Sequence, residues 1–312
     1  MTAEAPVSQY RHEAMLWRGH DDFLDGCVPF ILDGIEGGEP VMVATTNARV
    51  SLLADALGPG AAEVRFVDME LLGANPARII PAWAEFVRGA GGRPARGIGE
   101  PIWAGRSEVE IAECQLHESL LNLALSAETP LWLRCPYDVD GLPVSVIEEA
   151  ERSHPVVTAH GAPATRTHPY AGAEQAHAAF TAMLPVPRTV DLLTTFGATD
   201  LRRVRGEVGA AAHRHGVVPD RAADLALAIH ELAANSVRHA GGAGVLRIWR
   251  EPGALVCEVA DHGQVLDPLT GRVGVPSEGA SGRGLWMVNH LCDLVQLRSS
   301  DAGTSVRVHT WL

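Results

Sequence analysis

Glu231 and Asn235 lie four residues apart in the segment HELAANSVRHA (residues 230–240), at the end of an otherwise apolar stretch. Residues at this spacing share one face of a helix, about 6 Å apart. A carboxylate can take a proton from a hydroxyl and an amide oxygen can hold Mg²⁺, so both could serve one phosphoryl group. Taken alone, the pair fits a polar edge on a core helix better than a site.

Three further segments carry residue types that suit a nucleotide. Asp261 ends a predicted buried strand, where a carboxylate needs donors because its desolvation costs several kcal/mol; an adenine amino group or a backbone turn could supply them. Gly263 follows and permits a close approach. Gly282 and Gly284 precede an apolar helix, whose free N–H groups and positive end favour phosphate. Thr304 enters the last strand.

In this order the four segments resemble the ATP-binding domain shared by gyrase, Hsp90, histidine kinases and MutL, and above all its anti-sigma-factor serine kinases. The matching stretches are ELAANSVRHA, DHG, SGRGLWMVNHLCD and GTSVRV. The resemblance covers residues 186–312 and implies an α+β sandwich of the histidine-kinase-type ATPase fold.

The resemblance also implies residue roles. Glu231 would be the catalytic base for a substrate serine, and Asn235 would hold the Mg²⁺ that bridges the phosphates. The other implied nucleotide-binding residues are Asp261 and Gly263 at the adenine, Gly282, Arg283 and Gly284 at the phosphates, and Thr304 in the adenine-side network.

The implied function is a signal-responsive anti-sigma regulatory factor that binds ATP and Mg²⁺ and phosphorylates a serine of an anti-sigma-factor antagonist, with a sigma factor as second partner. Two departures leave phosphotransfer open: Gln264 and Val265 follow Gly263, and Ala280 replaces a frequent arginine. The alternative is a non-catalytic, nucleotide-dependent protein-binding module. A sensor histidine kinase fits less well, because the candidate acceptors lack a long amphipathic hairpin; they are His154, His160, His168 and His177.

Residues 1–158 are predicted to form a separate α/β domain. From about residue 10, short apolar strands alternate with amphipathic helices, which indicates βαβ units and a largely parallel sheet. The stretches HEAMLWRG, GEPVMVATT, RIIPAWAEF, RGIGEPIWAGR, ECQLHESLLN and LWLRCPYD resemble the methanogen/methylotroph sensory domain (MEDS). That resemblance implies a RecA-like layout and a sensor of small, often hydrocarbon-type signals.

Pocket candidates in this domain lie near the predicted strand ends, where open parallel sheets usually bind ligands. They are Glu100, Trp103, Arg106, His117, Glu118, Tyr137 and Asp138. For the stretch EPIWAGR, an Arg–Glu pair that packs a loop against Trp103 is an equally good interpretation.

Residues 159–185 are predicted to be a linker, since the chain from about residue 155 is rich in Ala, Pro, Gly and Thr, with a short helix in GAEQAHAAFTAML. The domain of residues 186–312 should then contain antiparallel strands. Its helices are expected over 200–216, 219–240 and 284–295, and a mobile lid over 264–281.

Composition excludes several functions. A net charge of −13 argues against nucleic-acid binding. All 25 basic residues are arginine, so neither a Walker-A loop nor a Schiff-base lysine exists. No apolar run approaches the roughly 20 residues that span a bilayer, and no signal-peptide core is visible, so we expect a cytoplasmic protein. The oligomeric state stays open, a homodimer included.

The cysteine pattern predicts neither disulfides nor a structural zinc site, because five cysteines lie far apart without a CxxC pair. Two short groups contain metal-ligand types, His213 with His215, and Cys114 with His117. Neither has a third and a fourth ligand at a plausible spacing, so no metal is expected there.

Overall fold

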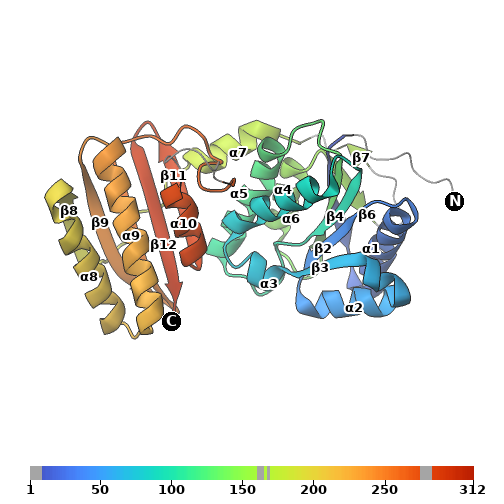
Figure 1. The fold of residues 1–312 in the computed structure, drawn as a ribbon, viewed down its shortest axis with the longest axis horizontal. Coiled ribbons are helices and arrows are strands. Elements are labelled where there is room, and N and C mark those ends of the chain that lie inside the picture. Colours follow the sequence, from blue (N-terminus) through green and yellow to red (C-terminus); the bar gives the residue numbers. More distant parts are fainter. Residues whose placement is uncertain (1–8, 160–164, 167–168, 275–282) are drawn as a thin grey trace. The chain divides into compact units, whose positions relative to one another are not determined.

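The computed structural model describes residues 9–159, 165–166, 169–274 and 283–312 (Figure 1). The described chain divides into two compact units, and the division falls between Ala176 and His177. Among the described helices, none is both long enough and apolar enough to cross a membrane.

The first unit is built on a largely parallel sheet, as the alternating pattern predicted. The strand order is β3-β2-β4-β5-β1-β6-β7, and all neighbours run parallel except β6 and β7. The strands are β1 (Arg11–Trp17), β2 (Val41–Thr45), β3 (Val64–Asp68), β4 (Ala95–Gly99), β5 (Leu131–Asp138), β6 (Val156–Ala159) and β7 (Thr165–Arg166).

Helices cover both faces of this sheet (Figure 1). On one face, Phe23 and Ile31 of α1 pack with Trp17 of the sheet in an apolar core. On the other face, the indole of Trp83 lies so close to Gly97 that a Cβ there would be 2.6 Å from the ring. The first face carries α1 (Gly19–Glu36) and α2 (Asn47–Leu57), and the second α4 (Ile79–Ala90), α5 (Glu108–Ala124) and α6 (Val144–Ser153).

The linker-like composition begins at about residue 155, but the next four residues still belong to the sheet. Residues 156–159 form β6, which pairs in parallel with β1, and Thr158 Oγ1 donates to Glu13 Oε1 over 3.0 Å. Three β-branched residues in a row favour this strand, but the Pro- and Gly-rich stretch that follows dominated the local composition. Further on, α7 occupies Gly172–Thr181.

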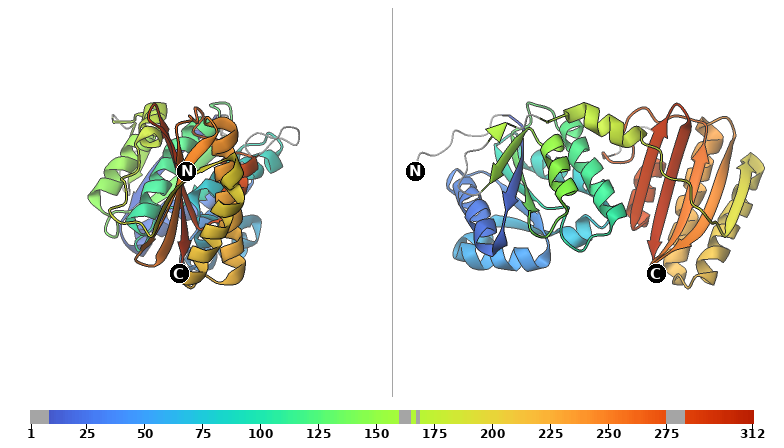
Figure 2. Two further views of the ribbon diagram at one scale, coloured as in Figure 1. Left: turned by 90° about the vertical axis from the view of Figure 1, so that its left-hand side faces the viewer. Right: turned by 180° about the vertical axis from the view of Figure 1, so that it is seen from behind.

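The second unit has two layers, a five-stranded antiparallel sheet and helices on one face (Figure 2). The strand order is β11-β12-β10-β9-β8. The elements are β8 (Leu192–Gly197), α8 (Leu201–Arg214), α9 (Pro219–His239), β9 (Ala243–Glu251), β10 (Ala254–Asp261), α10 (Arg283–Leu291), β11 (Leu294–Ser300) and β12 (Gly303–Trp311). This is the predicted α+β architecture.

One predicted helix in this unit is too long. The helix expected over 284–295 ends at Leu291, and Leu294 and Val295 already belong to β11. The Asp293 carboxylate accepts a hydrogen bond from the backbone N–H of Trp311 over 2.7 Å, which anchors the turn to β12. Apolar residues on both sides of this turn concealed it in the sequence.

Candidate functional site

Helix α9 carries the two side chains that could do chemistry. Pro219 stands at its first position, where the missing N–H costs nothing. Its apolar stripe, which includes Leu225 and Ile229, is buried against the sheet. Glu231 and Asn235 lie at the edge of that stripe, and the Glu231 side chain keeps 28% of its surface exposed.

Four segments distant in sequence enclose a cavity of about 560 Å³ beside α9. The described residues predicted to bind a nucleotide all line it: Glu231, Asn235, Asp261, Gly263, Arg283, Gly284 and Thr304. Gly282 lies outside the described residues.

Asp261 ends β10, and both of its carboxylate oxygens already accept hydrogen bonds within the unit. Ser236 Oγ donates to Oδ2 over 2.5 Å, and the backbone N–H of Gly263 donates to Oδ1 over 2.8 Å. These donors hold the carboxylate in the cavity wall. Because each oxygen has a second lone pair, Asp261 can still accept a hydrogen bond from an amino group.

Thr304 connects the loop after Asp261 to the sheet. It pairs with Asp261 across β10 and β12, and its hydroxyl donates to the carbonyl oxygen of Gly263 over 2.8 Å. Ser299 Oγ lies 2.8 Å from Thr304 Oγ1 and accepts from the backbone N–H of Val265 over 2.9 Å. Thr304 therefore acts on the cavity through this hydrogen-bond chain.

Two glycines allow close approaches at the cavity. A Cβ on Gly263 would lie 2.7 Å from Ala240 Cβ, so the end of α9 requires glycine there. A Cβ on Gly284 would lie 3.1 Å from Asn235 Nδ2 and 3.6 Å from Glu231 Oε2. The N-terminus of α10 thus faces both polar side chains, and an anion at this helix end would lie beside them.

Part of the cavity wall is apolar. Four buried apolar side chains from α9 and from three strands, each at most 6% exposed, contribute to it: Leu232, Val259, Leu297 and Val306. An apolar wall with a few convergent polar groups is typical of a site for a flat aromatic ligand.

The polar surroundings of the predicted site residues include side chains that were not predicted. Arg238 Nη2 donates to Asn235 Oδ1 over 3.2 Å and lies 4.0 Å from Glu231 Oε2. Arg238 follows Asn235 by three residues and Glu231 by seven, so the sequence could have placed all three on one face of the helix. Ser236 and Gly303 also support the cavity through Asp261.

The predicted lid over 264–281 is described only as far as Gly274. In this part, Asn289 Nδ2 donates to the carbonyl oxygen of Gly271 over 2.8 Å, which connects the loop to α10. Gln264 Nε2 donates to Asp301 Oδ1 over 3.1 Å. The other lid residues lie outside the described chain, so the lid stays a prediction.

In the first unit, the pocket candidates of EPIWAGR separate into two groups. The Arg106 guanidinium lies 3.8 Å from the ring centre of Trp103, and its acid partner is Glu110, at 3.2 Å. Glu100 instead forms an ion pair with Arg49. Arg106 therefore packs the loop against Trp103, as in the second interpretation, but with a different acid.

The other candidates of this unit also have separate surroundings. Asp138 Oδ1 accepts the backbone N–H groups of Asp140 and Gly141 in a turn after β5. His117 and Tyr137 are buried. Glu118 belongs to a buried cluster that was not predicted, with His12, Cys135 and His154. The five cysteines are all free and buried in this structure.

In comparisons with known proteins, the two units match two different family models. Residues 11–155 match the family model of the methanogen/methylotroph, DcmR sensory domain (MEDS), and residues 195–310 match that of the histidine kinase-like ATPase domain. No curated protein matches the chain. One matching solved structure contains the RsbU and RsbW domains of Rv1364c from Mycobacterium tuberculosis, with 19% identity and a TM-score of 0.29; the match covers 41% of this chain and 33% of that chain. Both family resemblances seen in the sequence are confirmed.

Proposed function

We propose that this chain, which carries a MEDS sensory domain followed by a histidine kinase-like ATPase domain, is a signal-responsive regulator that phosphorylates a protein partner. Its C-terminal domain would bind ATP with Mg²⁺ and transfer the γ-phosphoryl group to a serine. The observation that carries this proposal is the single cavity formed by Glu231, Asn235, Asp261 and the N-terminus of α10.

The residues present fit a magnesium nucleotide. Asp261 offers an acceptor for the adenine amino group beside an apolar wall. Asn235 offers an amide oxygen for Mg²⁺, which would neutralise charge on the phosphates when bound. The N–H groups at the start of α10, beside Asn235 and Glu231, would donate hydrogen bonds to the phosphates.

In the proposed transfer, Glu231 accepts the proton of the serine hydroxyl as the serine oxygen bonds to the γ-phosphorus. The bond between that phosphorus and the β,γ-bridging oxygen breaks, and ADP leaves. Arg238 and Arg283 would supply positive charge near the transferred group. The order of the four segments, which resembles anti-sigma-factor serine kinases, supports an anti-sigma-factor antagonist as the phosphorylated partner and a sigma factor as the second partner.

One observation favours a non-catalytic alternative, in which the nucleotide only controls partner binding. Arg238 donates to the same Asn235 oxygen that would hold Mg²⁺, and it lies near the Glu231 carboxylate. If Arg238 stays there with nucleotide bound, both proposed functional groups remain engaged and no base is available. For a histidine kinase, two of the four candidate acceptors are described: His154 is fully buried, and the exposed His177 lies on α7, which has only ten residues and does not form the long hairpin such an acceptor needs.

Two measurements test the proposal. Calorimetric titration of the full chain with ATP, with and without Mg²⁺, should show Mg²⁺-dependent binding that Asn235→Ala loses. Incubation with γ-labelled ATP and candidate antagonists should then place acid-stable label on a partner serine. Mg²⁺-dependent binding without any transfer would support the binding module, and no nucleotide binding would overturn both.

A further inference from the structure

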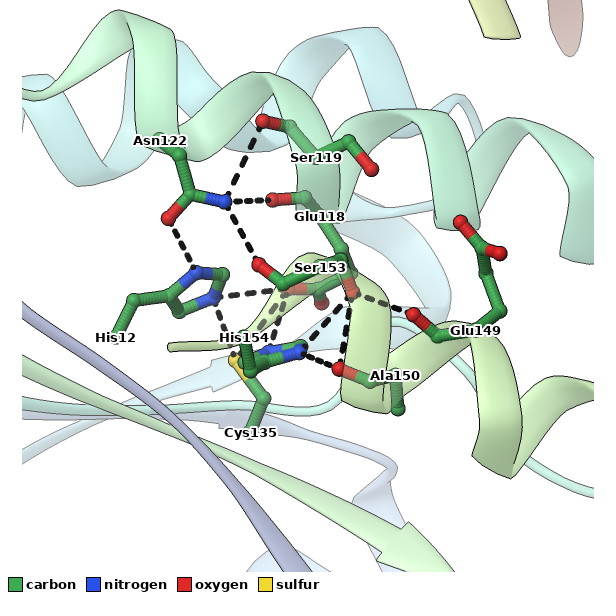
Figure 3. Close-up of polar contacts among 9 residues, drawn as sticks. All are labelled: His12, Glu118, Ser119, Asn122, Cys135, Glu149, Ala150, Ser153 and His154. Atoms are coloured by element: carbon green, nitrogen blue, oxygen red, sulfur yellow. Dashed lines mark hydrogen bonds and ion pairs between the residues drawn. The ribbon is translucent and has the colours of Figure 1, made fainter. Parts of the chain in front are cut away.

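Four side chains of metal-ligand type converge inside the first unit, far in sequence from one another (Figure 3). His12 comes from β1, Glu118 from α5, Cys135 from β5, and His154 follows α6. Each residue is at most 1% exposed. One potential ligand atom from each residue lies within 4.8 Å of the other three. We call these four residues the His–Cys cluster.

Four of the six separations between the potential ligand atoms of the His–Cys cluster are close to those of ligands around one small ion. Glu118 Oε2 lies 3.1 Å from His12 Nε2, 3.3 Å from His154 Nε2 and 3.5 Å from Cys135 Sγ. Cys135 Sγ lies 3.5 Å from His12 Nε2. Tetrahedral zinc, with bonds of about 2.0–2.1 Å to nitrogen and oxygen and about 2.3 Å to sulfur, keeps its ligand atoms roughly 3.3–3.6 Å apart.

The surroundings of His12 fix which ring nitrogen carries the proton. Asn122 Nδ2 donates to the carbonyl oxygen of Ser153 over 2.8 Å, so the amide turns its Oδ1 toward His12. That oxygen lies 3.1 Å from His12 Nδ1 and can only accept, hence Nδ1 donates. In a neutral His12 ring, Nε2 then presents a lone pair to the centre of the cluster.

His154 has the same arrangement. Its Nδ1 lies 2.8 Å from the carbonyl oxygen of Ala150, which can only accept, so Nδ1 donates and Nε2 faces Glu118. In the neutral rings, two nitrogen lone pairs therefore point at a carboxylate oxygen. Such contacts repel unless a metal ion or an additional proton lies between them. A second hydrogen bond from Nδ1 to a carbonyl or amide oxygen is also the usual way in which proteins orient metal-binding histidines.

We propose that His12, Glu118, Cys135 and His154 bind one Zn²⁺ ion. A sulfur ligand with two imidazoles and a carboxylate suits zinc better than magnesium or calcium. Because four protein ligands complete a tetrahedron, the ion would have no open position for a substrate. It would connect β1, β5, α5 and the chain entering β6, as a structural metal of the sensory domain. In the metal-free alternative, the same residues form a polar core held by extra protons.

Metal analysis of the full chain, purified without a metal-affinity step, tests the proposal. We expect about one Zn²⁺ per chain, either as purified or after incubation with ZnCl₂ and desalting. In competition with a chelator, Cys135→Ser should lower the zinc affinity by at least tenfold, and Asn122→Ala, which removes the orienting amide, by about 10- to 100-fold.

Cys114→Ser is the matched control. Cys114 is also a buried free cysteine of this unit, but its thiol donates to the carbonyl oxygen of Pro101 and a hydroxyl can do the same. This variant should keep its zinc. Cobalt-loaded wild type and Cys114→Ser should both show a thiolate-to-metal charge-transfer band that Cys135→Ser lacks.

Three results would overturn the proposal. A wild-type chain that neither carries nor takes up Zn²⁺ would favour the metal-free polar core. Equal retention by Cys135→Ser and Cys114→Ser would place the metal elsewhere. Stoichiometric iron or copper that zinc cannot displace would overturn the choice of ion. The wild-type measurements decide even if Cys135→Ser fails to fold, and none depends on nucleotide binding by the second unit.

Discussion

The cavity of the second unit and the His–Cys cluster of the first both collect polar side chains from distant segments, but one is open and the other closed. At the cavity, Glu231 keeps 28% of its side chain exposed, whereas the Glu118 side chain keeps 1%. The carboxylate of Asp261, for example, accepts hydrogen bonds from Ser236 and Gly263 and also lines the cavity. The cluster groups have no contact with solvent and depend on one another. An open site suits a ligand that is exchanged, and a closed one suits an ion that stays.

The largest expected effect concerns chemistry in the open site. Glu231→Gln keeps the shape of the side chain but removes its basicity, so we expect phosphotransfer to fall by about 10²- to 10⁴-fold. Nucleotide affinity and the thermal unfolding midpoint should change little, because the side chain is partly solvated. Single-turnover transfer, titration calorimetry and thermal unfolding measure the three quantities.

Glu207→Gln is the matched control for this change. Glu207 also lies on a helix, pairs with an arginine and has 28% of its side chain exposed, but it does not belong to the residues that line the cavity. Equal loss of transfer in both variants would mean that the carboxylate of Glu231 has no special role.

The second largest effect concerns a buried ion pair of the first unit. Glu100 is fully buried and pairs with Arg49, and Arg49→Ala leaves its charge uncompensated. We expect a loss of about 3–5 kcal/mol in the stability of the first unit. By contrast, Arg18→Ala removes an exposed ion pair with Asp140 in the same unit and should change stability little. Calorimetric unfolding of both variants gives the comparison.

The loss in Arg49→Ala should depend on pH. Burial raises the pKa of Glu100, and in the wild type Arg49 opposes that rise. Without Arg49 the folded-state pKa rises further above the unfolded value, so protonation favours the folded state. The stability difference between wild type and Arg49→Ala should therefore shrink as pH falls. It should grow as pH rises from the folded-state pKa of Glu100 in the wild type to that in the variant. A deficit that is constant with pH would contradict a buried charge as its cause.

The same contrast explains what the sequence could reveal. The cavity residues fall within short contiguous motifs, each at a helix end or a turn, so Glu231, Asn235 and Asp261 could be identified before the structure. His12 and Cys135 are single residues within apolar strands. Only the parallel pairing of β1 with β5 brings them to one face, and no spacing rule along the chain encodes that pairing.

The sequence predicted the elements that are marked by their own residues, and it missed those that depend on a distant partner. The helix expected over 219–240 is found as α9 (Pro219–His239), because Pro219 and the apolar periodicity of the segment mark it in the sequence. The strand β6 was hidden by its Pro- and Gly-rich neighbours, and it exists because β1 offers it a partner. Ser236 lies inside a recognised motif but was passed over, because its partner Asp261 is 25 residues away.

A third, smaller effect tests how the open site is supported. Gly303 has a φ of 124°, and a Cβ there would clash with the carbonyl oxygen of Asp261. Gly303→Ala should cost about 1–2 kcal/mol for the backbone conformation and a further ~1–3 kcal/mol for the clash. Because Asp261 must move, nucleotide affinity should fall as well, which titration calorimetry and thermal unfolding of the variant measure together.

Gly253→Ala separates these two contributions. Gly253 also has a positive φ, 77°, but nothing lies within 4 Å of the place that a Cβ would take, so only the conformational cost applies. Nucleotide affinity should stay at the wild-type value in this control. Equal stability losses in the two variants would show that the close contact at Asp261 relaxes without cost.

The smallest effect separates an orienting role from a structural one at Ser236. Its hydroxyl is one of two protein donors to the Asp261 carboxylate, at 2.5 Å, and Ser236→Ala removes it. Since a hydrogen bond to a charged group contributes about 1.5–3 kcal/mol, part of which a water can restore, we expect a roughly 5- to 10-fold weaker affinity for ATP. The preference for ATP over GTP should fall too, because a less firmly held carboxylate selects the adenine amino group less well.

Ser51→Ala is the control. It removes an exposed hydroxyl that is bonded to the Asn47 carbonyl in the first unit, and it should change neither the affinity for ATP nor the preference for ATP over GTP. If Ser236→Ala lowers the unfolding temperature but leaves both nucleotide affinities unchanged, then Ser236 stabilises α9 against β10 without orienting Asp261, and the wall of the cavity is more rigid than its hydrogen bonds indicate.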